Sequence, residues 1–183
     1  MANSSEIFSA LLARQKRALL FHDQWCVIFN FLNLHGFKRL HQYRYLTESK
    51  EMLKIQRYYI KQHDRLIKPI TVEAVSEIPN DWYGAERSEV TASIIAQHTK
   101  RVFQSHIQWE SDTLALLRKS ARELMEQGEI ADYEFVSDMI CDVSKELEYA
   151  KRLYYKIGAS GFDVIFLEEI QDEIHDKFKE KIK

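Results

Sequence analysis

The chain has 183 residues, of which 45% are hydrophobic and 30% are charged, and its formal net charge is -2 at pH 7. This composition is typical of a globular domain large enough to bury a core, and it excludes a largely disordered chain. No stretch approaches the roughly 18 uncharged apolar residues of a membrane span, so we expect no membrane-spanning segment.

The helix-breaking residues gather at a few points and leave long uninterrupted segments between them. Proline removes a helix donor, and glycine costs about 1 kcal/mol in a helix interior. Pro69 and Pro79 fall in one short stretch, and the five glycines separate segments with helical apolar spacing. We therefore predict one domain over residues 1–183, with helices at residues 4–34, 37–67, 82–127, 130–157 and 162–181.

The predicted breaks define the order in which these helices pack. Short turns at His35-Gly36 and at Gly128 make two antiparallel pairs. Residues 68–81 between the pairs are long enough to run the length of a bundle, at ~3.3 Å per extended residue. The sequence thus predicts an all-α four-helix bundle with a long crossover and a short fifth helix. Residues 87–100 lack an obvious partner in this arrangement, and we expect them at a subunit interface.

Charge is divided unevenly along the chain. Residues 1–68 hold 12 Lys/Arg and 5 Asp/Glu, giving +7, whereas the remaining 14 Lys/Arg and 23 Asp/Glu give -9. The two halves could pair within the bundle or between subunits, or the basic half could face an anionic partner. Because tyrosines lie among the basic residues of the second helix, nucleic-acid binding is one hypothesis, with anion contacts at Lys50, Lys54, Arg57 and Lys61.

The second predicted helix also carries a resemblance to a known family. Residues 34–52, Leu-His-Gly-Phe-Lys-Arg-Leu-His-Gln-Tyr-Arg-Tyr-Leu-Thr-Glu-Ser-Lys-Glu-Met, are similar to the turn and second helix of bacterioferritins, and Gln24-Trp25 is similar to a Gln-Tyr of their first helix. The likeness covers about 30 residues, and the predicted topology extends it to the rest. The resemblance implies the ferritin-like fold, whose oxidases hold two irons with a Glu from each of two helices and a Glu-x-x-His from each of the other two.

The chain departs from that ligand pattern. The Glu-x-x-His of the second helix falls on Glu51 and Lys54, or on Met52 and Ile55 if it is shifted by one residue. The first helix offers Arg17 or Ala18 in place of a glutamate, and the fourth offers Ile140 and Val143 in place of glutamate and histidine. We therefore expect a degenerate diiron site.

Four residues remain as candidate metal ligands. Glu48 and Glu51 of the second helix could meet His106 and Glu110 of the third in the middle of the bundle and hold one iron, manganese or zinc ion. The alternative is that Glu51 is solvated, Glu48 hydrogen-bonds an aromatic side chain, and His106 and Glu110 form an ordinary i,i+4 pair. The other six histidines show no paired ligand spacing.

Three hypotheses follow. The leading one is a non-catalytic binding or interaction protein, a homodimer without a cofactor or catalytic residue, on a ferritin-like scaffold. The second is a divergent ferritin-like metal-binding protein or oxidase, and the third is a nucleic-acid-binding protein. The two cysteines lie in apolar helical segments, and the first residues do not resemble a signal peptide, so we expect a cytoplasmic protein with buried, reduced thiols.

Overall fold

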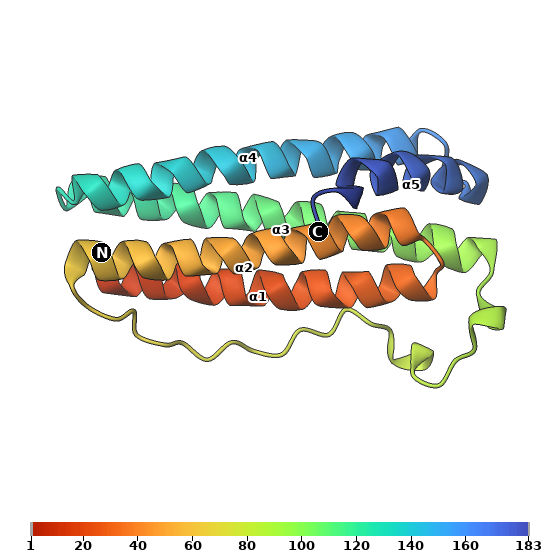
Figure 1. Ribbon diagram of the computed structural model, residues 1–183, viewed down its shortest axis with the longest axis horizontal. Helices are drawn as coiled ribbons and strands as arrows, with labels where there is room; N and C mark the ends of the chain where they lie inside the picture. The colour runs from red at the N-terminus through yellow and green to blue at the C-terminus, as the bar shows by residue number, and fades with distance from the viewer. Residues whose placement is uncertain (1, 183) are drawn as a thin grey trace.

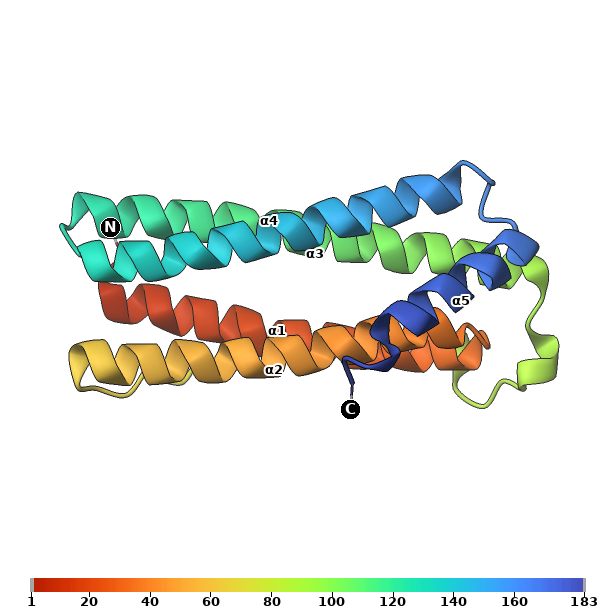
Figure 2. The same ribbon diagram turned by 45° about the horizontal axis from the view of Figure 1, so that its top comes forward.

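The computed structural model describes residues 2–182 as an all-α bundle of two antiparallel helix pairs (Figure 1). The first pair is α1 (Ser4–Phe31) and α2 (His35–His63), and the second is α3 (Ala92–Glu126) and α4 (Ile130–Gly158). Residues 64–91 run back along the first pair, so that α2 and α3 point the same way (Figure 1). The fifth helix, α5 (Val164–Lys179), lies across one end of the bundle (Figure 2). Among the described residues, none of the helices is long and apolar enough to cross a membrane.

Local chemistry explains where most of the helices begin and end. Asn3 caps α1 in a reciprocal capping box with Glu6. The turn between α1 and α2 passes through Asn33 at φ 62°, and Gly128 at φ 76° separates α3 from α4. Both conformations are left-handed, which asparagine and glycine tolerate better than other residues.

The helix boundaries differ from prediction on either side of the crossover. Helix α2 ends at His63, because Asp64 adopts a left-handed conformation, rather than at residue 67. Helix α3 begins at Ala92 rather than near residue 82, because the Thr91 side chain accepts a hydrogen bond from the Ile94 amide and caps it. Two 3₁₀ turns, Asn80–Trp82 and Arg87–Glu89, occupy the residues between.

Residues 87–100 find partners within their own chain, contrary to our expectation. Val90, Ile94 and Ile95 pack against the large core cluster, and an Arg87 guanidinium nitrogen donates to the Asn30 carbonyl oxygen at 2.8 Å. The segment therefore has partners in its own chain, although more than half of its residues are exposed, and its place at a subunit interface stays a prediction. Cys141 also differs from prediction, since it is exposed, whereas Cys26 is half-buried.

Apolar side chains form two clusters, one toward each end of the bundle. The larger includes Trp25, Phe29, Phe37 and Phe103, and α5 adds Leu167, Ile170, Ile174 and Phe178 to it. The smaller cluster, at the opposite end, includes Phe8, Ile55, Leu117 and Val136. Polar side chains interrupt the core between the two clusters.

Helix α5 is held by a close approach to the start of α2. A Cβ at Gly36 would overlap the backbone carbonyl oxygen of Gln171, so only glycine fits at this position. The Gly36 amide also donates to the Gln171 side-chain oxygen at 3.3 Å. Because α5 follows α4 in sequence but packs on α2, it ties the second helix pair to the first (Figure 2).

A buried carboxylate joins three helices at the other end of the bundle. Asp132, near the start of α4, is 1% exposed and accepts hydrogen bonds from the Ser4 hydroxyl and, at 2.9 Å, from the Tyr58 hydroxyl. The His63 Nε2 lies 3.0 Å from both of its oxygens. We call Ser4, Tyr58, His63 and Asp132 the Asp132 cluster.

Candidate metal centre

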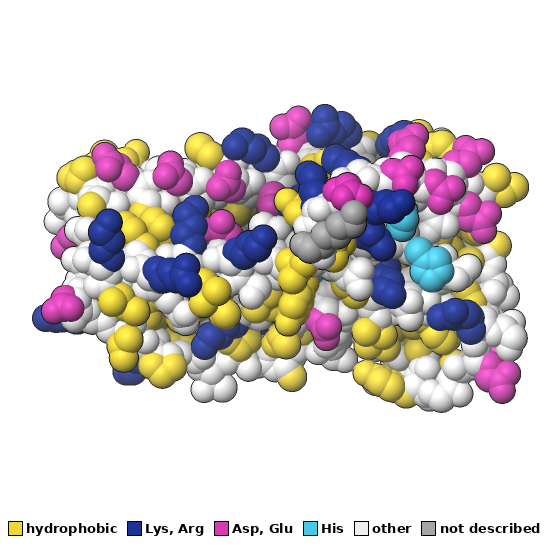
Figure 3. All heavy atoms as spheres, in the orientation of Figure 1, with side chains coloured by type: hydrophobic (Ala, Val, Ile, Leu, Met, Phe, Trp, Pro, Cys, Tyr) yellow, Lys and Arg dark blue, Asp and Glu magenta, His cyan; other side chains and the backbone are white. Residues whose placement is uncertain are grey.

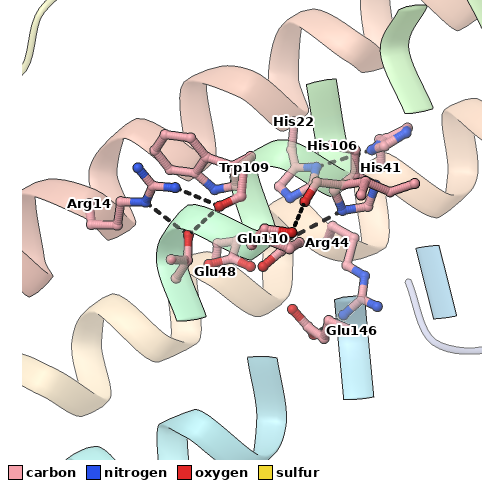
Figure 4. Close-up of polar contacts among 12 residues, drawn as sticks. Arg14, His22, His41, Arg44, Glu48, His106, Trp109, Glu110 and Glu146 are labelled. Atoms are coloured by element: carbon pink, nitrogen blue, oxygen red, sulfur yellow. Dashed lines mark hydrogen bonds and ion pairs between the residues drawn. The ribbon is translucent and has the colours of Figure 1, made fainter. Parts of the chain in front are cut away.

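Three histidines and a glutamate meet in the middle of the bundle, where the apolar core is interrupted. His22 of α1, His41 of α2 and His106 of α3 are each at most 1% exposed, and Glu110 of α3 is 2% exposed. Each position lies on the inward face of its helix, so the packing that buries Trp25 buries them too. Figure 4 shows these side chains gathered around Glu110. We call His22, His41, His106 and Glu110 the Glu110 cluster.

The three imidazoles form a compact triangle. The ring centroids of His22, His41 and His106 are each 5.3 Å from the other two. Nδ1 of His22 lies 3.0 Å from Nδ1 of His41, a distance at which one nitrogen donates and the other accepts. On the other side, Nε2 of His106 lies 3.4 Å from Oε1 of Glu110. This last pair is close enough for electrostatic attraction but is not aligned as a hydrogen bond.

Burial keeps two of these imidazoles neutral. It lowers the pKa of His22 well below its usual value, and the positive forms of His106 and His41 lower that pKa further. Burial, followed by His106 and Arg44, lowers the pKa of His41 in the same direction. A neutral imidazole has one nitrogen with a free lone pair, which is the form that binds a metal ion.

A second group of carboxylates adjoins the Glu110 cluster. One ligand oxygen from each of Glu48, Glu110 and Glu146 lies within 4.8 Å of those of the other two. Burial, followed by the charge of Glu110, raises the pKa of Glu48 above its usual value. The Gln15 amide donates to Glu48, and the Arg44 guanidinium forms an ion pair with Glu146 (Figure 4). These two carboxylates therefore have partners within the protein.

A cavity of 440 Å³ connects this region with the solvent between α2 and α4. Glu48 and Glu110 line its inner part together with Arg14, whose guanidinium lies 3.1 Å from the Trp109 ring centroid. The surface residues around it include three lysines and two carboxylates, namely Lys145, Lys177, Lys181, Glu51 and Asp142. An ion or small molecule could therefore reach Glu110 from outside.

Unpartnered polar atoms are concentrated in the Glu110 cluster. The buried atoms without a hydrogen-bond partner include Nε2 of His22, Nε2 of His41, both ring nitrogens of His106 and Oε1 of Glu110. Buried polar groups are almost always paired, and an unpaired one costs about 1–3 kcal/mol. Because one ligand atom each of His22, His106 and Glu110 lies within 4.8 Å of the other two, this donor set fits a metal ion that would bind several of them at once.

The structure brings together three of the four ligands predicted from sequence. His106 and Glu110 form the predicted i,i+4 pair, and Glu48 lies on the other side of Glu110. Glu51 belongs to neither candidate group; its carboxylate lies at the surface of the cavity, 3.6 Å from Nζ of Lys54. The partner of Glu48 is Gln15 rather than an aromatic side chain.

Sequence reasoning missed His22, His41 and Glu146. The histidines lie on different helices, so no spacing within one helix reveals them. A signal was nevertheless present, because His22 is three residues before the buried Trp25 and His41 is four residues after the buried Phe37. A histidine within an apolar stripe is a candidate ligand when stripes from other helices also carry one.

The basic residues proposed for anion binding all lie on the outer side of α2. Lys50, Lys54, Arg57 and Lys61 are exposed. Figure 3 shows lysine and arginine side chains spread over the face on which α2 lies, with hydrophobic atoms between them. Their accessibility permits contact with an anionic partner, and nucleic-acid binding stays a prediction.

Comparison with solved structures relates this architecture to ferritins. Apo-ferritin from Pseudo-nitzschia multiseries has a TM-score of 0.75 at 13% sequence identity, covering 91% of this chain and 95% of that one. A variant of PmFTN soaked in iron matches with the same values. A humanized archaeal ferritin has a TM-score of 0.74 at 15% identity, covering 94% of this chain and 97% of that one. No protein-family model and no curated protein sequence matches the chain. The chain therefore has the ferritin-like fold, as its sequence predicts.

Proposed function

We propose that this protein binds a divalent transition-metal ion in the core of its bundle, at Glu110. The observation that carries the proposal is the position of this carboxylate: it is 2% exposed, belongs to both candidate ligand groups, and has one oxygen without a hydrogen-bond partner. A buried carboxylate costs several kcal/mol unless a cation or a set of donors compensates its charge. A metal ion would supply that compensation.

The nearby guanidiniums have other partners: that of Arg14, whose charge acts on Glu110, donates to the Thr113 hydroxyl and the Trp109 carbonyl oxygen. Arg44, a buried arginine of α2, forms an ion pair with Glu146, and the neutral His22 and His41 carry no charge of their own. The solved structures with the same fold include ferritin crystals soaked in iron, which gives the proposal a precedent on this scaffold. A bound ion would supply Lewis-acid or redox chemistry, while the protein residues would hold it and shield it from water.

We also propose that each chain binds one such ion. The Glu-x-x-His pattern of a diiron site is incomplete, and Arg44 lies among the carboxylates where a further cation would be repelled. A non-catalytic scaffold without metal is the competing hypothesis, and one experiment separates the two.

The test is metal content by ICP mass spectrometry, followed by calorimetric titration of the metal-free protein with Zn²⁺, Fe²⁺ and Mn²⁺. We expect about one ion per chain, lost in Glu110→Gln but retained in Glu51→Gln, which removes a half-buried carboxylate outside both groups. A folded wild-type protein that binds none of these ions would overturn the proposal and favour the scaffold. Two ions per chain with oxidase activity would contradict the single site.

For the assembly we propose a homodimer through the outer faces of α1 and α2. Exposed apolar residues recur there at intervals of seven, at Leu20 and Val27 on α1 and at Leu46, Leu53 and Ile60 on α2. Such a stripe fits a second copy of the same surface. Sedimentation analysis should give twice the chain mass for the wild type and a monomer for Leu53→Glu. The control is Tyr155→Glu, at an exposed position on α4, which should stay dimeric.

A further inference from the structure

We infer that the ion is coordinated by two imidazoles and one carboxylate, from His22, His106 and Glu110, and that His41 positions His22. This inference rests on the proposed function and identifies the ligands, the class of metal and a positioning residue. It differs from the carboxylate-rich diiron pattern that the family resemblance implies. Two of the four residues, His22 and His41, show no ligand spacing in the sequence.

The first support is convergence from separate helices. One ligand atom from each of His22, His106 and Glu110 lies within 4.8 Å of those of the other two. Since metal–nitrogen and metal–oxygen bonds are about 2.0–2.2 Å, one ion could bind three atoms at such separations after small side-chain rotations. All three residues are at most 2% exposed, so water does not compete freely for them.

The second support comes from the hydrogen bond between His22 and His41. Metal binding at Nε2 of His22 requires the proton on Nδ1, and that nitrogen lies 3.0 Å from Nδ1 of His41, which can accept it. Nε2 of His22 then carries a lone pair, has no hydrogen-bond partner and is free to bind the ion. A ligating histidine generally has its second nitrogen held in this way, which sets both its tautomer and its ring orientation.

The third support is the contrast with the adjacent carboxylates. Glu48 accepts from Gln15 and Glu146 is paired with Arg44, whereas His22 Nε2 and both nitrogens of His106 lack hydrogen-bond partners. The positive charge of Arg44 also disfavours a cation on the carboxylate side. The ion should therefore take the imidazole side of Glu110. Such a nitrogen-rich set suits Zn²⁺, Fe²⁺ or Co²⁺ and disfavours Mg²⁺ and Ca²⁺.

Co²⁺ is the probe for this coordination, because its visible absorption bands report the ligand atoms. In metal-free wild-type protein we expect one equivalent of Co²⁺ to bind, to develop these bands and to be displaced by Zn²⁺ but not by a large excess of Mg²⁺. Tryptophan fluorescence should fall at the same time, since the ring centroid of Trp25 is 5.1 Å from that of His22 and 5.3 Å from that of His106.

The ligand variants are His22→Phe and His106→Phe, with His22→Gln as a polar alternative if the first is unstable. Each should weaken Co²⁺ binding by more than about 100-fold and alter the bands that remain. The control is His98→Phe, a half-buried histidine of α3 that packs on Trp82 with ring centroids 4.4 Å apart. Unchanged affinity and bands in both His22 variants would overturn the inference.

His41→Phe tests the positioning role separately. Loss of the hydrogen bond to His22 should weaken Co²⁺ binding by about 10–100-fold while the band positions stay those of the wild type. Changed bands would make His41 a ligand, and unchanged affinity would remove its role; either result contradicts the inference. If Glu110→Gln abolishes binding while the histidine variants bind normally, the imidazole site fails but the proposed function stands. If the wild type binds no metal, both fail.

Discussion

Two buried carboxylates, Asp132 and Glu110, lie in the same bundle but differ in their hydrogen-bond partners. Asp132 is 1% exposed, and both of its oxygens are contacted by donors from α1 and α2. Glu110 is 2% exposed, and its Oε1 has no aligned donor. The two carboxylates are therefore equally buried, but only Asp132 has hydrogen-bond partners for both oxygens.

The difference indicates two roles for buried polarity. A satisfied cluster such as that around Asp132 joins helices, because breaking any part of it leaves other groups without partners. A cluster with several unpartnered atoms lowers stability unless something outside the chain binds them. The Asp132 cluster is thus expected to be structural, and the Glu110 cluster is expected to be a ligand site.

The largest expected effect follows from Asp132→Ala. This change leaves the hydroxyls of Ser4 and Tyr58 and the ring of His63 without their common acceptor, and it should lower the free energy of unfolding by about 4 kcal/mol. Urea unfolding followed by circular dichroism measures it. Asp138→Ala, at an exposed position of the same helix, is the control. A loss below about 1 kcal/mol would show that the cluster does not join the helices.

Metal addition should stabilise the folded protein, and only through the Glu110 cluster. Zn²⁺ at 100 times its dissociation constant should raise the free energy of unfolding by about 2.7 kcal/mol, through preferential binding to the folded state. Differential scanning fluorimetry should show an increase in Tm in wild-type protein and none in Glu110→Gln. An equal increase in both proteins would place the ion elsewhere.

Removal of one donor from the Asp132 cluster should have a smaller effect that depends on pH. Tyr58→Phe should cost about 1.5 kcal/mol at neutral pH. Burial, followed by the hydrogen bond to Asp132, raises the pKa of Tyr58, so its contribution is complete below pH 10 and is lost as the pH rises through the folded-state pKa. The stability of the two proteins should converge above pH 10. A constant difference across that range would contradict this assignment.

The smallest expected effect has the opposite sign. In metal-free protein, Glu110→Gln removes a buried charge without a hydrogen-bond partner on Oε1, and it should raise the free energy of unfolding by about 1 kcal/mol. Urea unfolding in the presence of a chelator measures the change. Destabilisation by a similar amount would mean that the chain alone satisfies Glu110, which would weaken the contrast with Asp132.

The fold could be predicted because it depends on local signals. Glycines and prolines mark the breaks, and apolar spacing identifies the helices between them. The helix boundaries next to the crossover were harder to predict. The helical conformation ends at Asp64 and resumes at Ala92 for reasons that include tertiary packing. The spacing of residues 82–91 is compatible with a helix, yet two 3₁₀ turns and an extended residue at Val90 are adopted there.

The candidate site could be predicted only where it lies within one helix or one stripe. His106 and Glu110 are four residues apart on α3, and Glu48 interrupts an apolar stripe, so all three were identifiable. His22 and His41 meet because α1 and α2 pack in a particular register. That register depends on the packing of the whole bundle, so residue spacing within each helix does not reveal the contact.

The close approach of Gly36 to α5 has a mechanical consequence. This contact holds the two helix pairs together at one end, while hydrogen bonds of the Asp132 cluster hold α4 against α1 and α2 at the other. The cavity lies between these two sets of contacts. Because contacts hold the helices together at both ends, we expect a bound ion to exchange through this cavity without unfolding of the helices.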